Sequence, residues 1–189
     1  GSAYFDMLAE VAILKLKHFN SYDLSNMLWA YANVGISHSK LFKKAGDTII
    51  EMENLNEFWP QALSNIVWAY ATLNEQHPKL FKKVADHIVA LDNSALARFD
   101  PQALSNIVLA YATAQESHPK LFEKVADHIV TLDHLNSFKP QELSNTVWAY
   151  ATAEESHPKL FQKIADTSIK RQHEFVPQGI ANFLWAYAT

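Results

Sequence analysis

The stretch Phe58-Trp-Pro-Gln-Ala-Leu-Ser-Asn-Ile-Val-Trp-Ala-Tyr-Ala-Thr72 decides the fold, because the chain contains it several times. Close copies start at Phe99, Phe138 and Phe175, and a looser copy starts at Phe19. Self-similarity at a nearly fixed period is the signature of stacked structural repeats, in which each unit buries its apolar face against its neighbours. The sequence therefore predicts a row of similar units.

Each copy contains two helical patterns, which we call helix A and helix B. In the second copy helix A is expected over 60–73, where Pro60 takes the first-turn position at which a missing N–H is no loss. Apolar residues follow at helical spacing. A polar turn over 74–78 ends in His-Pro, and helix B is expected from about 79 to 91. No strand-like alternation appears.

The recurrent Asn of helix A sets the register, with spacings of 39, 41, 39 and 37 residues between successive copies: Asn26, Asn65, Asn106, Asn145 and Asn182. We predict one all-α domain over 1–189, a right-handed α-α superhelix (solenoid) of tandem two-helix repeats of about 37–41 residues. Its units are a B helix over 4–18, repeats over 19–57, 58–98, 99–137 and 138–174, and a first helix of a fifth repeat over 175–189.

Neither end of the sequence shows the polar capping repeat that solenoids normally need for solubility. We therefore expect a piece of a longer array, with A helices lining the inner surface. Exposed apolar ends also predict end-to-end self-association in concentrated solution.

Composition excludes several classes of function. The chain has no Cys, which excludes disulfides, thiolate catalysis and cysteine zinc sites. No apolar run approaches the roughly 20 residues that span a bilayer, so no membrane partner is expected. The net charge is -4 and the pI about 6.1. This is the wrong sign for a protein that binds nucleic acid mainly by neutralising phosphates, but it permits base reading by neutral side chains.

The nine His residues form no catalytic or metal-binding pattern. His77, His118 and His157 each precede a Pro, where a helix start explains them. His87 and His128 share one phase of helix B but lack the carboxylate partners of a metal site. No nucleophile elbow, phosphate-binding Gly loop or His-Glu-x-x-His motif is present. We predict no enzyme activity, no metal and no cofactor.

Most basic residues are expected on the B helices. These are ten of the sixteen Lys and Arg: Lys40, Lys43, Lys44, Lys79, Lys82, Lys83, Lys120, Lys124, Lys159 and Lys163. Asp residues are interleaved with them, which favours a solvated outer face. A phosphate track along the B-helix starts is the alternative.

The motif Pro-Gln-x-Leu-Ser-Asn-x-Val-Trp-Ala-Tyr-Ala-Thr, in a two-helix unit of this length, resembles the octotricopeptide repeat (OPR) family and its close relatives. The resemblance covers nearly the whole chain, from about Tyr4 to Thr189, and its core recurs in phase at 63–71 and 143–151. The copies depart from the motif at three places: Leu109 for Trp, Ala181 for Ser, and Asn20-Ser21-Tyr22 for the Pro-Gln start.

The resemblance implies an RNA-binding solenoid that acts in post-transcriptional regulation, mostly in chloroplasts or mitochondria. It implies sequence-selective binding of single-stranded RNA along a groove, without catalysis. A protein-interaction scaffold that grips an extended peptide or a partner domain is the alternative. The acidic composition favours protein as the partner, whereas a ladder of varying residues on the A helices favours RNA.

Three helix A positions that vary between copies are the candidates for RNA contacts. The residue after the Phe is Asn20, Trp59, Asp100, Lys139 or Val176. Three residues further on stands Asp23, Ala62, Ala103, Glu142 or Gly179. Four beyond that comes Met27, Ile66, Ile107, Thr146 or Phe183. Offsets of three and four residues predict that these positions share one helix face. Other helical-repeat proteins read one RNA base per repeat with two or three side chains. Unconstrained surface or packing is the alternative interpretation.

The constant Asn of each copy calls for a hydrogen-bonding role, because Asn is a mediocre residue in the middle of a helix. Two interpretations remain open. The Asn ladder either bridges neighbouring repeats or grips an RNA backbone or an extended peptide in the groove. The Trp residues three positions further on, such as Trp68, are interpreted as packing between helices.

Overall fold

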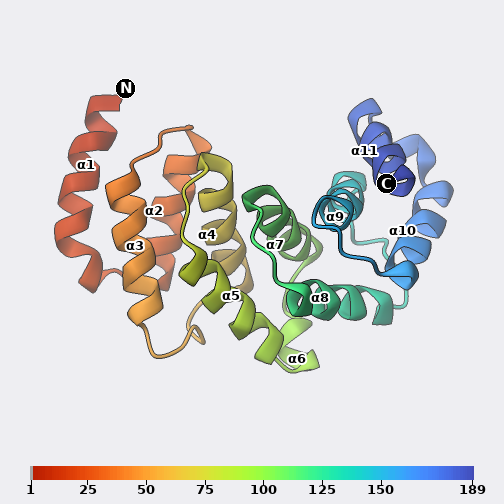
Figure 1. The fold of residues 1–189 in the computed structure, drawn as a ribbon, viewed down its shortest axis with the longest axis horizontal. Coiled ribbons are helices and arrows are strands. Elements are labelled where there is room, and N and C mark those ends of the chain that lie inside the picture. Colours follow the sequence, from red (N-terminus) through yellow and green to blue (C-terminus); the bar gives the residue numbers. More distant parts are fainter. Residues whose placement is uncertain (1) are drawn as a thin grey trace.

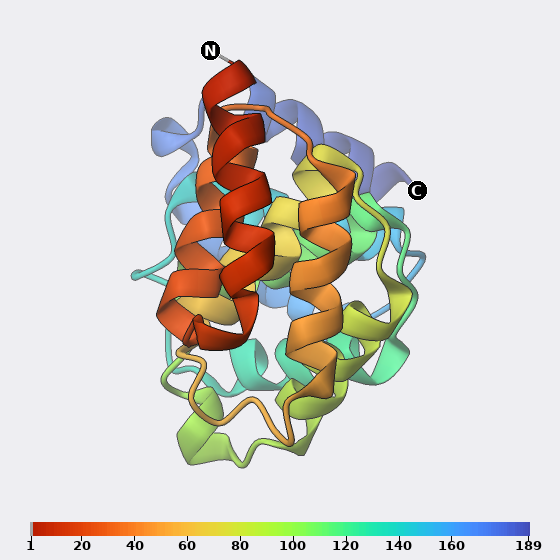
Figure 2. The ribbon, with the colours of Figure 1, turned by 90° about the vertical axis from the view of Figure 1, so that its left-hand side faces the viewer.

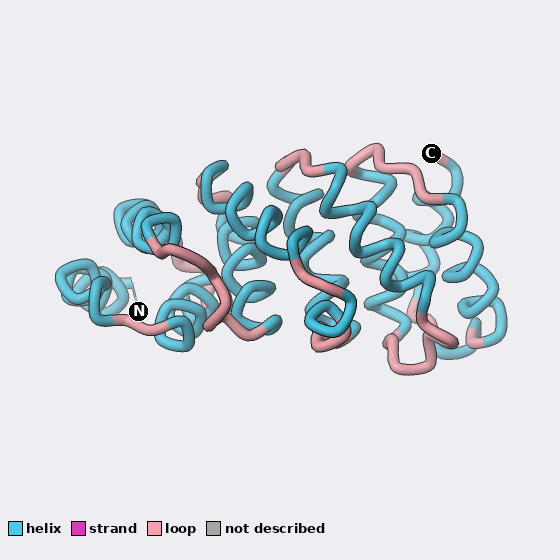
Figure 3. Tube along the Cα trace, turned by 90° about the horizontal axis from the view of Figure 1, so that it is seen from below, coloured by secondary structure: helices cyan, strands magenta, loops and turns pink. Residues whose placement is uncertain are grey.

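The computed structural model describes residues 2–189, and within that range every regular element is a helix (Figures 1 and 3). The A helices are α2 (Ser21–Asn33), α4 (Pro60–Leu73), α7 (Pro101–Ala114), α9 (Pro140–Thr152) and α11 (Pro177–Ala188). The B helices are α1 (Ser2–Lys15), α3 (Ser39–Glu51), α5 (Pro78–Ala90), α8 (Pro119–Thr131) and α10 (Pro158–Lys170). Short turns form η1 (Leu16–His18), α6 (Asn93–Leu96) and η2 (Gln172–Glu174).

The helices form a two-layer α solenoid, which confirms the predicted fold class. Each A helix packs closely along the next A helix, whereas neighbouring B helices make fewer contacts. Figure 2 views the row from its N-terminal end, with α1 nearest the reader. Small buried side chains on α4, such as Ser64 and Ala69, let the axes of the A helices approach. A stack bends toward its more closely spaced layer, so we infer that the A helices form the inner layer.

A constant Tyr ties each A helix to the preceding B helix. The Tyr111 hydroxyl donates to the Phe81 carbonyl at 2.6 Å, and the two rings meet edge to face with centroids 5.0 Å apart. The other copies make the same bond at 2.5–2.6 Å: Tyr31 to Phe5, Tyr70 to Phe42, Tyr150 to Phe122 and Tyr187 to Phe161. Each joint between repeats therefore contains one hydrogen bond of fixed geometry.

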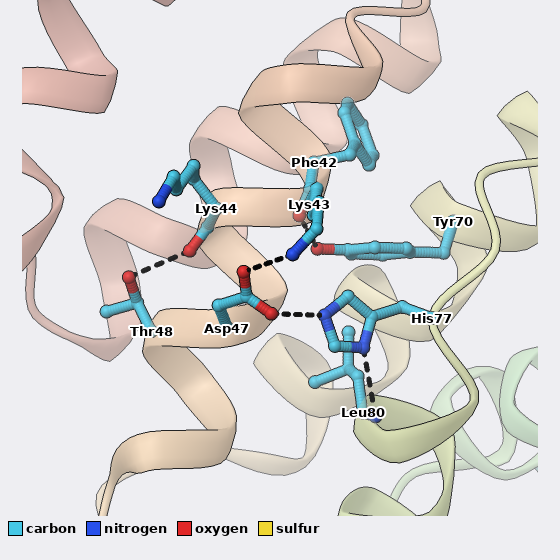
Figure 4. A network of polar contacts seen from close by, with 8 residues as sticks. All are labelled: Phe42, Lys43, Lys44, Asp47, Thr48, Tyr70, His77 and Leu80. Carbon is cyan, nitrogen blue, oxygen red and sulfur yellow. Dashed lines mark hydrogen bonds and ion pairs between the residues drawn. The ribbon is translucent and has the colours of Figure 1, made fainter.

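The His before each Pro also joins two repeats (Figure 4). His77 Nδ1 accepts the backbone N–H of Leu80 and so caps the start of α5, while Nε2 lies 3.2 Å from Asp47 Oδ1 on α3. Because Nδ1 is an acceptor, Nε2 carries the hydrogen and donates to Asp47. A hydrogen bond from Lys43, with His77 adding to it, lowers the pKa of Asp47. The same pairs recur in later repeats: His118 with Asp86 and His157 with Asp127.

Part of the basic outer surface is structural. Lys83 Nζ donates to Ile50 O at 2.9 Å and also to Met52 O, which places a cation at the C-terminal end of α3. Lys124 and Lys163 do the same for α5 and α8. These three side chains are half-buried, so the solvated face predicted from sequence applies only to the remaining Lys residues.

Candidate functional site: the amide face of the A helices

A stripe of polar and aromatic residues runs along the accessible side of each A helix. In α4 it consists of Gln61, Asn65, Trp68 and Thr72, whose spacings of four, three and four residues keep them on one side of a helix. The equivalents are Tyr22, Asn26, Trp29 and Asn33; Gln102, Asn106, Leu109 and Thr113; Gln141, Asn145, Trp148 and Thr152; and Gln178, Asn182, Trp185 and Thr189. We call this set the amide face. All of its members are exposed or half-buried.

The five Asn side chains of the amide face take part in no hydrogen bond within residues 2–189, and none is a buried unsatisfied group. The structure therefore contains no bridge between repeats made by these amides. Each Asn keeps two N–H donors and a carbonyl acceptor open to a ligand. A mid-helix Asn that serves no internal bond in any copy is the feature of the described chain that most directly points to binding.

The amide face carries no charged side chain. Charged residues lie beyond both ends of the A helices. Arg98, Asp100, Lys139 and Glu174 belong to the rim at the N-terminal ends, and Glu75, Glu116 and Glu154 follow the C-terminal ends. The face itself presents neutral donors, acceptors and aromatic rings, so it offers a polyanion little electrostatic attraction.

Two hollows open between the N-terminal halves of the A helices. One, of about 600 Å³, lies among α2, α4 and α7, and its lining includes Asn26, Asn65 and Trp59. The other, of about 520 Å³, lies between α9 and α11 and includes Asn145 and Asn182. Both volumes fall in the range of small-ligand sites. Four of the five Asn residues, all except Asn106, thus line these hollows.

Residues that vary between repeats line these hollows, and two of them are in contact. The Arg98 guanidinium lies over the Trp59 ring at 4.8 Å from its centroid. Lys139 and Glu174 line the same hollow. In each pair one member follows the constant Phe of its repeat and the other precedes the Phe of the next repeat. Four pairs of residues occupy these positions at the joints between repeats, and we call them the joint pairs: Asn20 with Glu57, Trp59 with Arg98, Asp100 with Ser137, and Lys139 with Glu174.

The second member of each joint pair was missed by the sequence reasoning, which considered only helix A. The signal was present, because the residue before the Phe differs in almost every copy: His18, Glu57, Arg98, Ser137 and Glu174. The residue before the Phe lies beside the preceding repeat only because the two repeats pack together. Residue spacing within one helix does not show that placement.

The first set of predicted contact residues is exposed. Asn20, Trp59, Asp100, Lys139 and Val176 are the N-cap residues of their helices. Two of them are engaged as caps, since Asn20 Oδ1 accepts the N–H of Asp23 at 2.9 Å and Asp100 Oδ1 accepts that of Ala103 at 2.7 Å. All five have extended backbone, so their side chains leave the helix end rather than continue a helical face.

The second set lies at the boundary of the core. Asp23 and Ala62 are half-buried, while Ala103, Glu142 and Gly179 are buried. Asp23 and Glu142 accept the backbone N–H of the N-cap residue, which occupies their carboxylates. The second position is therefore mainly structural.

The third set lies largely inside the solenoid. Ile66, Ile107 and Thr146 are fully buried, and the Thr146 hydroxyl donates to the Glu142 carbonyl at 2.7 Å. Met27 and Phe183 are half-buried. The three predicted contact positions do not form one helix face in the structure. The first and third positions are seven residues apart, and between them the chain changes from extended to helical at the helix end.

No protein-family model and no curated protein shows a significant match to the chain. Along residues 2–189, no helix has the length and apolarity needed to cross a membrane. The same residues contain no group of three or more His, Asp or Glu side chains placed to hold a metal ion. The assignment of a function therefore rests on the geometry of the amide face.

Proposed function

We propose that the amide face binds single-stranded RNA without catalysis. The unpartnered Asn residues, one in each A helix of the inner layer, carry this proposal. A carboxamide offers both donors and an acceptor, which match the edges of unpaired bases and the ribose hydroxyl. Because the same Gln and Asn recur in each repeat, these contacts would hold successive nucleotides in the same way. The Trp rings of the stripe offer stacking surfaces.

Selectivity among bases would come from the joint pairs, because they differ from joint to joint. Trp59 is exposed and presents a large ring for stacking, and Arg98 brings donors beside it. In the second hollow Lys139 offers a cationic donor, whereas the carboxylate of Glu174 accepts hydrogen bonds from Arg171. A nucleotide at each joint would then be read by two consecutive repeats.

The neutral face also sets the salt dependence expected of this binding. The affinity of a single strand falls with salt by about 0.7 in log K per log unit of salt for each phosphate neutralised. Arg98 and Lys139 are the basic residues that line the two hollows. We expect a shallow slope that corresponds to about two phosphate contacts.

An extended peptide is the second candidate ligand, favoured by the absence of charge on the amide face. Packed helices lie about 8–10 Å apart, and three residues of extended peptide cover about 10 Å. A row of carboxamides at that spacing would bond a peptide backbone once per three residues. RNA remains the preferred proposal because the joint pairs supply one differing site per repeat.

Selection from a randomised single-stranded RNA pool at two salt concentrations tests the proposal. The decisive variant changes the amides of three repeats together: Asn65→Ala, Asn106→Ala and Asn145→Ala. If each lost contact contributes about 1 kcal/mol, affinity falls about 100-fold. A matched variant removes one exposed residue per repeat from the other layer, Lys79→Ala, Lys120→Ala and Lys159→Ala, none of which makes a side-chain hydrogen bond.

We expect the Lys variant to retain affinity within about threefold at moderate salt, since its exposed side chains lie on the B helices and outside the amide face. Equal losses in the two variants would contradict the proposal and favour a phosphate track on the B helices. A pool with no enrichment at either salt concentration, together with enrichment from a random peptide library, would favour the peptide candidate.

A further inference from the structure

The hollow among α2, α4 and α7 combines aromatic surface with two opposite charges. Trp59 and Tyr22 line it, and their side chains are 69% and 71% exposed. Arg98 also lines it, with its guanidinium 4.8 Å from the centroid of the Trp59 ring. Asp100, two residues further along the chain, supplies the negative charge. The hollow therefore offers flat apolar rings, one cation and one anion to a ligand.

Both charged groups keep hydrogen-bonding capacity for that ligand. Asp100 Oδ1 accepts the backbone N–H of Ala103 at 2.7 Å, whereas Oδ2 has no hydrogen-bond partner among residues 2–189. The Arg98 guanidinium lies over the Trp59 ring, a contact that uses none of its N–H donors. A carboxylate only accepts hydrogen bonds and a guanidinium only donates them. The ligand that satisfies both must therefore present donors on one edge and acceptors on another.

Guanine is the RNA base that matches this pair of groups. Its Watson–Crick edge presents two adjacent donors, N1–H and the N2 amino group, to the carboxylate of Asp100, and its O6 and N7 accept from the guanidinium of Arg98. Adenine and cytosine present one amino group beside a ring nitrogen whose lone pair repels a carboxylate. Uracil places its single N–H between two carbonyl oxygens. The carboxylate therefore disfavours the other three bases.

The aromatic rings of the hollow accommodate the flat body of the base. Trp59 keeps most of its surface exposed beside Arg98, so a purine stacked on the indole has its edge next to the guanidinium. The amides of Asn26 and Asn65 line the same hollow and match the ribose hydroxyl. We propose that this hollow is a binding site for one guanine base. The inference rests on the proposed function, since the guanine is taken to be one base of the RNA on the amide face.

The second hollow, between α9 and α11, lacks this combination. The positions of the aromatic ring, the cation and the anion are occupied there by Lys139, Glu174 and Val176. Val176 has no carboxylate, and the carboxylate of Glu174 accepts from Arg171 at 3.0 and 2.7 Å. A preference for guanine is therefore expected at the first hollow and not at the second.

Fluorescence anisotropy with labelled oligouridines that carry one central guanosine, inosine or adenosine tests the site. We expect the guanosine oligonucleotide to bind about tenfold more tightly than the adenosine oligonucleotide. Inosine keeps N1–H, O6 and N7 but lacks the N2 amino group, so its oligonucleotide should bind with intermediate affinity. The readout is the ratio of affinities, because it cancels the contacts that all three oligonucleotides share.

Asp100→Asn removes the carboxylate and keeps the helix cap, because Asn caps helices as well as Asp does. This variant should bind the guanosine and adenosine oligonucleotides within about threefold of each other. Asp92→Asn is the matched control. Asp92 is the N-cap of α6, where it accepts the Ala95 N–H at 2.8 Å, and it does not line the hollow. The control loses the same charge and should keep the full preference for guanosine.

Equal affinities for the three oligonucleotides, or a preference that Asp100→Asn retains, would overturn the guanine site and leave RNA binding in place. If no oligonucleotide binds, the proposed function fails, and titrations with guanosine and adenosine monophosphate test the hollow by itself. A shift of the Trp59 indole N–H signal in NMR spectra with the guanine nucleotide alone would support the site. Equal shifts with both nucleotides, or no shift with either, would overturn it.

Discussion

Removal of the Tyr111 hydroxyl by Tyr111→Phe perturbs a single joint between two repeats. The hydroxyl is buried and donates to the Phe81 carbonyl at 2.6 Å. The Phe ring fills the same space, so the change removes a hydrogen bond and leaves the packing. At neutral pH we expect the free energy of unfolding to fall by about 1 kcal/mol. Tyr187→Phe removes the same bond at a partly exposed site, where water replaces it, and should cost less.

The effect of Tyr111→Phe should disappear at high pH. Burial raises the pKa of Tyr111 well above its usual value near 10, and the negative charge of Glu116 adds to the shift. The folded chain therefore keeps the phenol proton at a pH where the unfolded chain releases it. The stability contributed by Tyr111 is present in full below pH 10 and is lost as pH rises above it. The loss is about 1.4 kcal/mol at pH 11.

Because the Phe variant has no such proton, it should be as stable as the unaltered chain near pH 10.7 and more stable by about pH 11. Urea unfolding followed by circular dichroism at neutral pH and at about pH 11 measures both differences. The reasoning is refuted if the deficit of Tyr111→Phe persists or grows at the higher pH. It is also refuted if Tyr187→Phe costs as much as Tyr111→Phe at neutral pH.

Three further predictions concern the other joint contacts and the rim. Gly46→Ala should cost about 1–3 kcal/mol in urea unfolding, because its Cβ would lie 2.3 Å from the ring of His77. The cost should nearly vanish in a His77→Ala background, and an unchanged cost would contradict this origin. His118→Ala should cost about 1 kcal/mol by removing the acceptor for the Leu121 N–H, whereas an Asn cap at the same position should recover part of it. Trp59→Ala should weaken RNA binding by roughly tenfold through lost stacking, measured by fluorescence anisotropy with a labelled oligonucleotide; an unchanged affinity would exclude Trp59 from the site.

The repeated motif was enough to predict the helices and their order. The range 60–73 expected for helix A is the range of α4, because Pro60 starts the helix and Asn74 ends it in the left-handed conformation. Helix B, expected over 79–91, is α5 over 78–90. The longer spacing of 41 residues corresponds to the extra turn α6. Local signals determine these features, so sequence alone reveals them.

The candidate site was predicted less well, because it depends on how neighbouring repeats are placed. The sequence singled out the constant Asn, but whether Asn65 bonds to another repeat or to nothing is decided by the distance between helices. Likewise, Ile66 and Thr146 vary between copies while lying in the core. Variation there reflects repacking, not readout. Arg98 belongs to a different repeat from Trp59, and only the fold brings the two together.

The most direct test of the central claim follows the side-chain amide signals of the Asn residues by NMR while RNA enriched from the pool is added. The account predicts that five signals shift together, those of Asn26, Asn65, Asn106, Asn145 and Asn182. The signals of Asn residues in the connecting loops, Asn56 and Asn136, should stay in place. Shifts confined to the loop residues, with the five amides unmoved at saturating RNA, would contradict the claim.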